Sequence, residues 1–134
     1  MSKFLTPLHA RVTESEVDGE FRRTVTLNVD LIYVDDLAGR IVVKAGFESD
    51  GASVPQWFWN RYPPFGKYLA AAVVHDLLCV QGHADECAIS SKEAAAVFYR
   101  AMLVCGVGKF RAWKMWQAVR WFGPRWKAQK KPTD

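Results

Sequence analysis

The sequence lacks the features of secreted and membrane-spanning proteins. It has only three cysteines, Cys79, Cys87 and Cys105, and no C-x-x-C spacing, which argues against a disulfide framework and against a standard zinc knuckle. The longest apolar run, at residues 69–74, is far too short to cross a membrane. The N-terminal stretch has neither the apolar segment nor the cleavage site of a signal peptide. We therefore expect free thiols, no transmembrane segment and no signal peptide.

Several widespread catalytic motifs are also missing. The chain contains no G-x-S-x-G elbow, no glycine-rich phosphate loop and no H-E-x-x-H zinc motif. Internal repeats and low-complexity segments are absent as well. Any chemistry must therefore come from residues outside these familiar signatures.

Acidic residues are scarce toward the C-terminus. Residues 1–108 hold 10 Lys or Arg and 13 Asp or Glu, whereas residues 109–134 hold 8 Lys or Arg and a single Asp. The formal net charge of +4 is thus a property of the C-terminal end. Such an uneven distribution bears on binding partners rather than on the fold.

The composition that remains suits one folded domain. Half of the 134 residues are hydrophobic and 13% are aromatic, which is enough for a real core. Alternating apolar and polar residues predict a strand at 24–31, a return strand at 40–47 and an earlier strand at 11–17 that ends at Asp18-Gly19. The apolar face of the first of these would be Val25, Leu27, Val29 and Leu31.

Helical patterns begin after Gly51. Ser53 can cap a short helix with Pro55 in its first turn, and longer helices are predicted at 67–80, from Ser90 or Ser91 to about 105, and at about 110–122. We expect an α+β fold, a small N-terminal antiparallel β-sheet packed against about four C-terminal helices. Residues 1–126 would form the single domain and 127–134 a basic polar tail.

Two short polar stretches stand out against this apolar background. One is SDGASVP at residues 49–55, and the other is the dipeptide His75-Asp76 within an Ala- and Leu-rich helix. Because burying a charge is costly unless it is paired or bound to a metal, these side chains invite a functional interpretation. The catalytic candidates are Asp50, Ser53, His75 and Asp76, with His75, Asp76 and Asp50 as candidate ligands of a divalent metal ion that activates water.

The same residues have two other interpretations. They could form an acid/base pair oriented by a third group, or they could be structural, with Asp50 capping the turn and His75 donating to it. A further pattern, His75, Cys79, His83 and Cys87 at steps of four, would place soft metal ligands along one continuous helix. Gly82 is expected to end the helix before His83, which weakens that zinc hypothesis.

The C-terminal stretch KFRAWKMWQAVRWFGPRWKAQKK interleaves tryptophans with basic residues. The favoured interpretation is an amphipathic helix that packs Trp113, Trp116, Val119 and Phe122 on the core. An electrostatic contact with nucleic acid, an anionic membrane surface or an acidic protein is the functional alternative. Nucleic acid would be bound through Lys109, Arg111, Lys114, Arg120, Arg125 and Lys127.

Four blocks of the sequence resemble a small phage and prophage family known only as a domain of unknown function, number 1353. The blocks are GFESDGASVPQWFW, AAVVHDLL, SKEAAAVFYRAMLVCGV and AVRWFG, and the resemblance covers residues 20–123. The polar signature of the family falls on Asp50, Ser53, Pro55, His75 and Asp76. The chain departs from it at Cys79, where the family often has an aromatic residue, and at residues 94–96, where it often has an acid.

The resemblance implies a gene of a tailed phage or prophage but no established activity. The leading hypothesis is a phage accessory protein that acts as a small hydrolase, with a divalent metal ion as its candidate cofactor. The competing hypothesis is a non-enzymatic virion (tail or baseplate) or host-interaction protein that uses the basic, Trp-rich C-terminal surface. Its partners would be phage structural or host proteins, and the expected location is the host cytoplasm or the virion.

Overall fold

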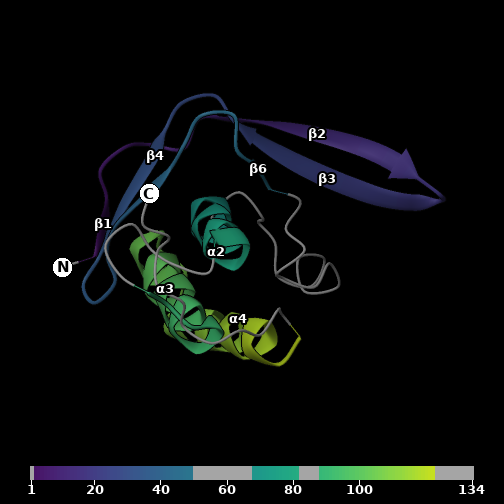
Figure 1. Cartoon of the computed structure of the whole chain (residues 1–134). Helices are drawn as coiled ribbons and strands as arrows, with labels where there is room; N and C mark the ends of the chain where they lie inside the picture. Colours follow the sequence, from purple (N-terminus) through teal and green to yellow (C-terminus); the bar gives the residue numbers. More distant parts are fainter. Residues whose placement is uncertain (1, 50–67, 82–87, 123–134) are drawn as a thin grey trace.

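The computed structural model of the chain describes residues 2–49, 68–81 and 88–122. These residues form strands followed by helices, so the expected α+β class is confirmed (Figure 1). They contain two small antiparallel sheets and three helices, rather than one sheet and about four helices. The short helix expected near Ser53 lies outside the described residues. The elements are β1 (Lys3–Phe4), β2 (Ala10–Val17), β3 (Glu20–Leu27), β4 (Leu31–Asp35), β5 (Gly39–Val43), β6 (Glu48–Ser49), α2 (Leu69–Gln81), α3 (Ser91–Val104) and α4 (Lys109–Phe122).

The sheets have the strand orders β1-β4-β5 and β2-β3-β6. The single strand expected at residues 24–31 is therefore wrong, because β3 ends at Leu27 and β4 begins at Leu31. Asp30 explains the break. Its Oδ1 accepts a hydrogen bond of 2.7 Å from the Ala45 amide. That amide is therefore bonded to a side chain and does not donate to a backbone carbonyl of a neighbouring strand.

The return strand expected at 40–47 is confirmed only to Val43, where β5 ends, and the short β6 begins just beyond the predicted range. Backbone hydrogen bonds bridge the break, from Leu27 N to Phe47 O at 3.1 Å and from Gly46 N to Leu27 O at 2.8 Å. The two sheets are thus joined through a bend. This bend carries β6 to α2, which it contacts directly.

The strands β2 and β3 form a long hairpin that extends away from the rest of the molecule (Figure 1). Its turn is the predicted Asp18-Gly19, with φ angles of 53° and 78°. Two successive positive φ values are the signature of the tight hairpin turn that Asp-Gly favours. The predicted strand and turn are both confirmed.

The helices lie on one side of the sheets, and both α2 and α3 contact strands (Figure 1). Helix α2 contacts β5 and β6 on one side and α3 on the other, and α4 packs on α3. No helix within residues 2–49, 68–81 and 88–122 is long and apolar enough to cross a membrane. The largest fully buried side chains belong to β4, β5, the three helices and the residues just before α2 and α3: Tyr33, Tyr68, Phe98, Leu31, Ile41, Leu78, Ile89, Met102, Met115, Val43 and Val73.

The ends of α3 follow directly from local sequence. Ser90, one of the two expected starts, caps the helix. Its hydroxyl accepts a hydrogen bond from the Glu93 amide at 3.2 Å, and the Glu93 carboxylate accepts one from the Ser90 amide at 3.2 Å, which together form a capping box. At the other end Gly106 has a φ of 89°. The amide of Val107 then donates to Met102 O at 3.0 Å, so glycine closes the helix in a Schellman motif.

Candidate functional site

The candidate site is centred on α2, the most buried helix. Every residue of α2 from Leu69 to Leu78 is buried except Ala70. Its sequence, LAAAVVHDLLCVQ, contains no glycine or proline to interrupt the helix. His75 and Asp76 therefore belong to a helix that lies between the sheets and α3, and their side chains are only 3% and 6% exposed.

Asp76 faces the sheets. Oδ2 of Asp76 accepts a hydrogen bond from the hydroxyl of Ser49, which is the last residue of β6 and is itself buried. This contact joins two segments that are 27 residues apart in the chain. A buried carboxylate needs such a donor, because an unsatisfied polar group in the interior costs free energy.

His75 faces α3. Its ring lies 5.1 Å from the ring of Phe98, centroid to centroid and tilted by 34°. One helical turn further on, Cys79 Sγ is 3.8 Å from Nδ1 of His75. Burial lowers the pKa of His75 to about 4. The imidazole is therefore neutral at pH 7, the form that can accept a proton or bind a metal ion.

The structure describes two of the four predicted site residues, and their side chains have different neighbours. Asp76 meets Ser49 and His75 meets Cys79 and Phe98, as expected for neighbours about 100° apart around a helix. Asp50 and Ser53 lie outside the described residues. Within the described part of the chain, no group of three His, Cys, Asp or Glu side chains is placed to hold a metal ion. His83 and Cys87 of the weaker zinc pattern also lie outside it.

Ser49 was missed as a site residue when the sequence was considered alone. A detectable signal was present, because Ser49 belongs to the same SDGASVP stretch as Asp50. The sequence did not show which residue the Ser49 hydroxyl contacts. Only the packing of β6 against α2 shows that the Ser49 hydroxyl reaches Asp76.

A second buried polar cluster was also missed. Asp35 is the last residue of β4 and accepts two hydrogen bonds from Arg100 of α3, from Nε to Oδ1 at 3.0 Å and from Nη2 to Oδ2 at 2.8 Å. The Tyr33 hydroxyl and the Leu37 and Ala38 amides also donate to it, at 2.9, 3.1 and 3.0 Å. Burial alone would raise the pKa of Asp35, but Arg100 and the two amides outweigh it and lower that pKa. The sequence contains a signal for the burial of Asp35, because it alternates with Leu31 and Tyr33 on the buried face of β4.

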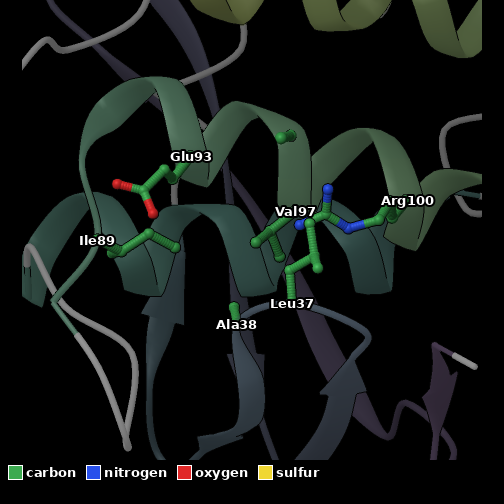
Figure 2. A pocket seen from close by; sticks show the side chains of 7 residues that line it. Leu37, Ala38, Ile89, Glu93, Val97 and Arg100 are labelled. Carbon is green, nitrogen blue, oxygen red and sulfur yellow. The ribbon is translucent and has the colours of Figure 1, made fainter.

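A small hollow lies between the β4–β5 turn and α3 (Figure 2). Arg100 and Leu37 stand on one side of it, and Glu93 and Ile89 on the other. Its volume is about 110 Å³, whereas pockets for drug-sized ligands measure roughly 300–1,000 Å³. The hollow has room for one apolar side chain or a few water molecules. We therefore assign the Asp35–Arg100 pair a structural role, fastening the turn to α3.

The outer surface of α4 differs from the sequence expectation. Val119 is buried and Trp116 is partly buried against the core, as predicted, but Trp113 is 47% exposed and its predicted packing is wrong. The buried residues of α4 are Ala112, Met115, Ala118 and Val119. These slimmer side chains form the contact with α3, and Trp113 lies about 200° around the helix from Met115. The side chain of Phe122 lies outside the described part of the structure.

The basic residues proposed to bind nucleic acid are placed in part. Lys109 is exposed on α4, and Arg111, Lys114 and Arg120 are partly buried. Lys114 Nζ lies 4.5 Å from the ring centroid of Phe110, and Arg120 Cζ lies 4.9 Å from that of Trp116. Cations held over aromatic faces in this way gain cation–π attraction. Arg125 and Lys127 lie outside the described residues.

Two curated relatives come from Sinorhizobium fredii. The uncharacterized protein y4jT is 32% identical over 120 residues, 88% of this chain and 34% of the relative. The uncharacterized protein y4iH is 35% identical over 102 residues, 75% of this chain and 41% of the relative. The chain thus spans less than half of the length of either relative. No solved structure matches it significantly.

The family comparison covers most of the described elements. The match extends over residues 25–119, from β3 through most of α4. It includes the Ser49–Asp76 contact, His75 and the Asp35–Arg100 pair. The chain therefore belongs to the family described as "Protein of unknown function (DUF1353)".

Proposed function

We propose that this protein is a small hydrolase whose site is built around His75 and Asp76. The observation that supports the proposal is the burial of two adjacent ionisable side chains in an otherwise apolar helix. Alanine or leucine at these positions would avoid the cost of desolvating an imidazole and a carboxylate. Buried groups with shifted pKa values cluster at functional sites, because catalysis needs unusual protonation states.

Each residue would have a distinct role. His75, kept neutral by burial, would act as the general base that accepts a proton from water, or as a metal ligand. Asp76, fixed by the Ser49 hydroxyl, would be a ligand or would orient the reacting water. Asp50 would be a second ligand or orienting group and Ser53 a donor behind it. Both follow Ser49 closely in the chain.

A divalent metal ion is the proposed cofactor. Neutral imidazole and carboxylate oxygen are donors that such ions accept, and the candidates that would hold one are His75, Asp76 and Asp50. A bound ion lowers the pKa of a coordinated water molecule and so supplies hydroxide at neutral pH.

Metal content and hydrolysis test this proposal together. The protein would be purified without a metal-binding tag, analysed by mass spectrometry and assayed on chromogenic esters, amides and phosphoesters. We expect a stoichiometric divalent ion in the wild type and loss of both ion and activity in His75→Gln and Asp76→Asn. A wild type that stays metal-free after addition of zinc, manganese and magnesium, and that hydrolyses none of these substrates, would refute the proposal.

Leu78→Ala is the matched control for stability. Leu78 is fully buried on the same helix, and its truncation should destabilise the fold by roughly 2–5 kcal/mol. Below its melting temperature this variant should keep the ion and the activity. Loss of activity in Leu78→Ala to the same degree as in His75→Gln would point to unfolding rather than chemistry.

The second candidate is a non-enzymatic virion or host-interaction protein. The observation in its favour is that the Ser49–Asp76 bond links β6 to α2, which is what a purely structural tie would do. In that case Asp50→Asn and Asp76→Asn should lower stability by about 1–3 kcal/mol, and function should fall only as far as folding does. A catalytic role predicts that function falls much further than folding does.

A phage or prophage origin is part of the proposal. Its support is the resemblance of the sequence blocks to a phage family. Sequencing the neighbouring genes tests the phage origin, because tail, lysis or packaging genes beside the coding sequence would show that it belongs to a phage or prophage genome. A setting of ordinary chromosomal genes would remove that part of the proposal.

A further inference from the structure

The solvent-facing side of α4 carries a row of aromatic rings. Phe110, Trp113 and Trp121 are 68%, 47% and 64% exposed. At 3.6 residues per turn they lie within about 80° of one another around the helix, and we call them the aromatic ridge. Large exposed apolar side chains that gather on one face mark an interaction site more often than scattered ones do.

The ridge is held in place rather than loosely attached. The rings of Phe110 and Trp113 are stacked, with centroids 6.4 Å apart and an interplanar angle of 15°. Nε1 of Trp121 donates to Oε1 of Gln117 at 3.0 Å, one turn back along the helix. The opposite face of α4 is anchored in the core by Met115 and Val119. The rings are therefore presented to solvent by a rigid support and are not part of the core.

Positive charge borders the ridge on both sides. By helical spacing Lys109 and Arg120 lie along one side and Lys114 along the other. The chain has no acidic residue between Glu93 and Asp134. Helix α4 is therefore basic without any acidic residue of its own, which is the charge that suits a negatively charged partner.

The shape of the face distinguishes among anionic partners. Single-stranded nucleic acid is bound in grooves whose walls follow the backbone while bases stack inside. The ridge instead consists of exposed side chains on a helix, and that helix, α4, lies at the edge of the molecule (Figure 1). An exposed row of tryptophan and phenylalanine with flanking lysine and arginine matches a helix lying in a bilayer interface, with rings among the headgroups and cations at the phosphates.

We propose that α4 binds the surface of an anionic lipid bilayer through the aromatic ridge and the cations Lys109, Lys114 and Arg120. The ridge enters the headgroup region, and the three cations contact lipid phosphates. Helix α4 packs mainly on α3, and the ridge residues are exposed whereas His75 and Asp76 are buried in α2, so the two sites are separate.

Vesicle sedimentation tests the proposal on the full chain. The vesicles would be phosphatidylcholine alone and a two-to-one mixture of phosphatidylcholine and phosphatidylglycerol. We expect binding to the mixed vesicles only, weakened by added salt. Trp121→Ala and Phe110→Ala should each reduce the binding constant several-fold, and Lys109→Glu by about fivefold or more, from the usual contribution of one basic residue near an anionic surface.

Matched changes elsewhere serve as controls. Leu37→Ala removes an exposed apolar side chain from the β4–β5 turn, and Lys92→Glu makes the same charge reversal on exposed α3 surface. Both should bind mixed vesicles as the wild type does. Absence of vesicle binding, or equal losses in the controls, would overturn the proposal. Binding of a single-stranded oligonucleotide that depends on Trp121 and Lys109, without vesicle binding, would overturn it in favour of nucleic acid.

Discussion

The hydroxyl of Ser49 donates a hydrogen bond to the carboxylate of Asp76, and this bond joins the end of β6 to the middle of the buried helix α2. Ser49 and Asp76 are 27 residues apart in the sequence and are neighbours in the fold.

The first prediction concerns this bond. Ser49→Ala should lower the free energy of unfolding by about 1–3 kcal/mol, because the buried carboxylate of Asp76 loses a donor. Urea unfolding measures the change. In a double-mutant cycle with Asp76→Asn, the two losses should be clearly non-additive, since both variants remove the same contact. Additive losses would mean that the two side chains do not interact.

The second prediction is a pH dependence that arises from His75. Its pKa is about 4 in the folded protein and near 6.5 when exposed, so the unfolded chain binds the extra proton first. Above pH 6.5 the neutral imidazole makes its full contribution to the free energy of unfolding. As the pH falls toward 4, this contribution decreases by about 3 kcal/mol. Urea unfolding at pH 7.5 and pH 4.5 would show the loss. His75→Leu should flatten the profile in this window, and an unchanged profile in that variant would contradict the assignment.

The third prediction concerns the tie between the β4–β5 turn and α3. Arg100→Ala should destabilise the protein by about 3 kcal/mol, because the fully buried carboxylate of Asp35 keeps only neutral donors. Arg100→Lys should recover little, since an ammonium cannot reproduce the paired contacts of the guanidinium. Thermal unfolding provides the measurement. Arg40→Ala, at an exposed position on β5, should change stability by no more than about 0.5 kcal/mol.

The fourth prediction compares two large side chains of α4. Met115→Ala should cost roughly 2–5 kcal/mol, because it leaves a cavity at a fully buried position. Trp113→Ala should cost much less, although it removes more atoms, because nearly half of that side chain is exposed. Unfolding with guanidinium chloride would measure the free energy of unfolding of both variants and show which is less stable. A larger loss from Trp113→Ala would reverse the assignment of the inner and outer faces of α4.

Local sequence signals predicted the elements that depend on neighbouring residues. The Asp18-Gly19 turn, the Ser90–Glu93 capping box and the termination of α3 before Gly106 were all predictable, because each relies on backbone preferences within a few residues. The strand at residues 24–31 could not be divided correctly. Its break depends on a hydrogen bond from Ala45, which lies fifteen residues beyond Asp30.

In the candidate site, too, the sequence predicted what depends on local pattern and missed the contacts between distant residues. Sequence alone selected His75 and Asp76, because polar residues in an apolar helix are unusual at any position. It did not select Ser49 or pair Asp35 with Arg100, which is 65 residues away. Contacts at that separation follow from how the layers pack, and no short sequence pattern encodes them.

What the sequence by itself determined is the α+β class, the helix limits, the hairpin turn and the basic C-terminal end, all of which follow from local propensity, periodicity and composition. Only the tertiary structure decided which face of α4 is buried and which polar groups meet. The amphipathic pattern of α4 allows more than one rotation against α3. The side chains that fit the space between the two helices, Ala112, Met115 and Val119, select one of them and leave Trp113 in solvent.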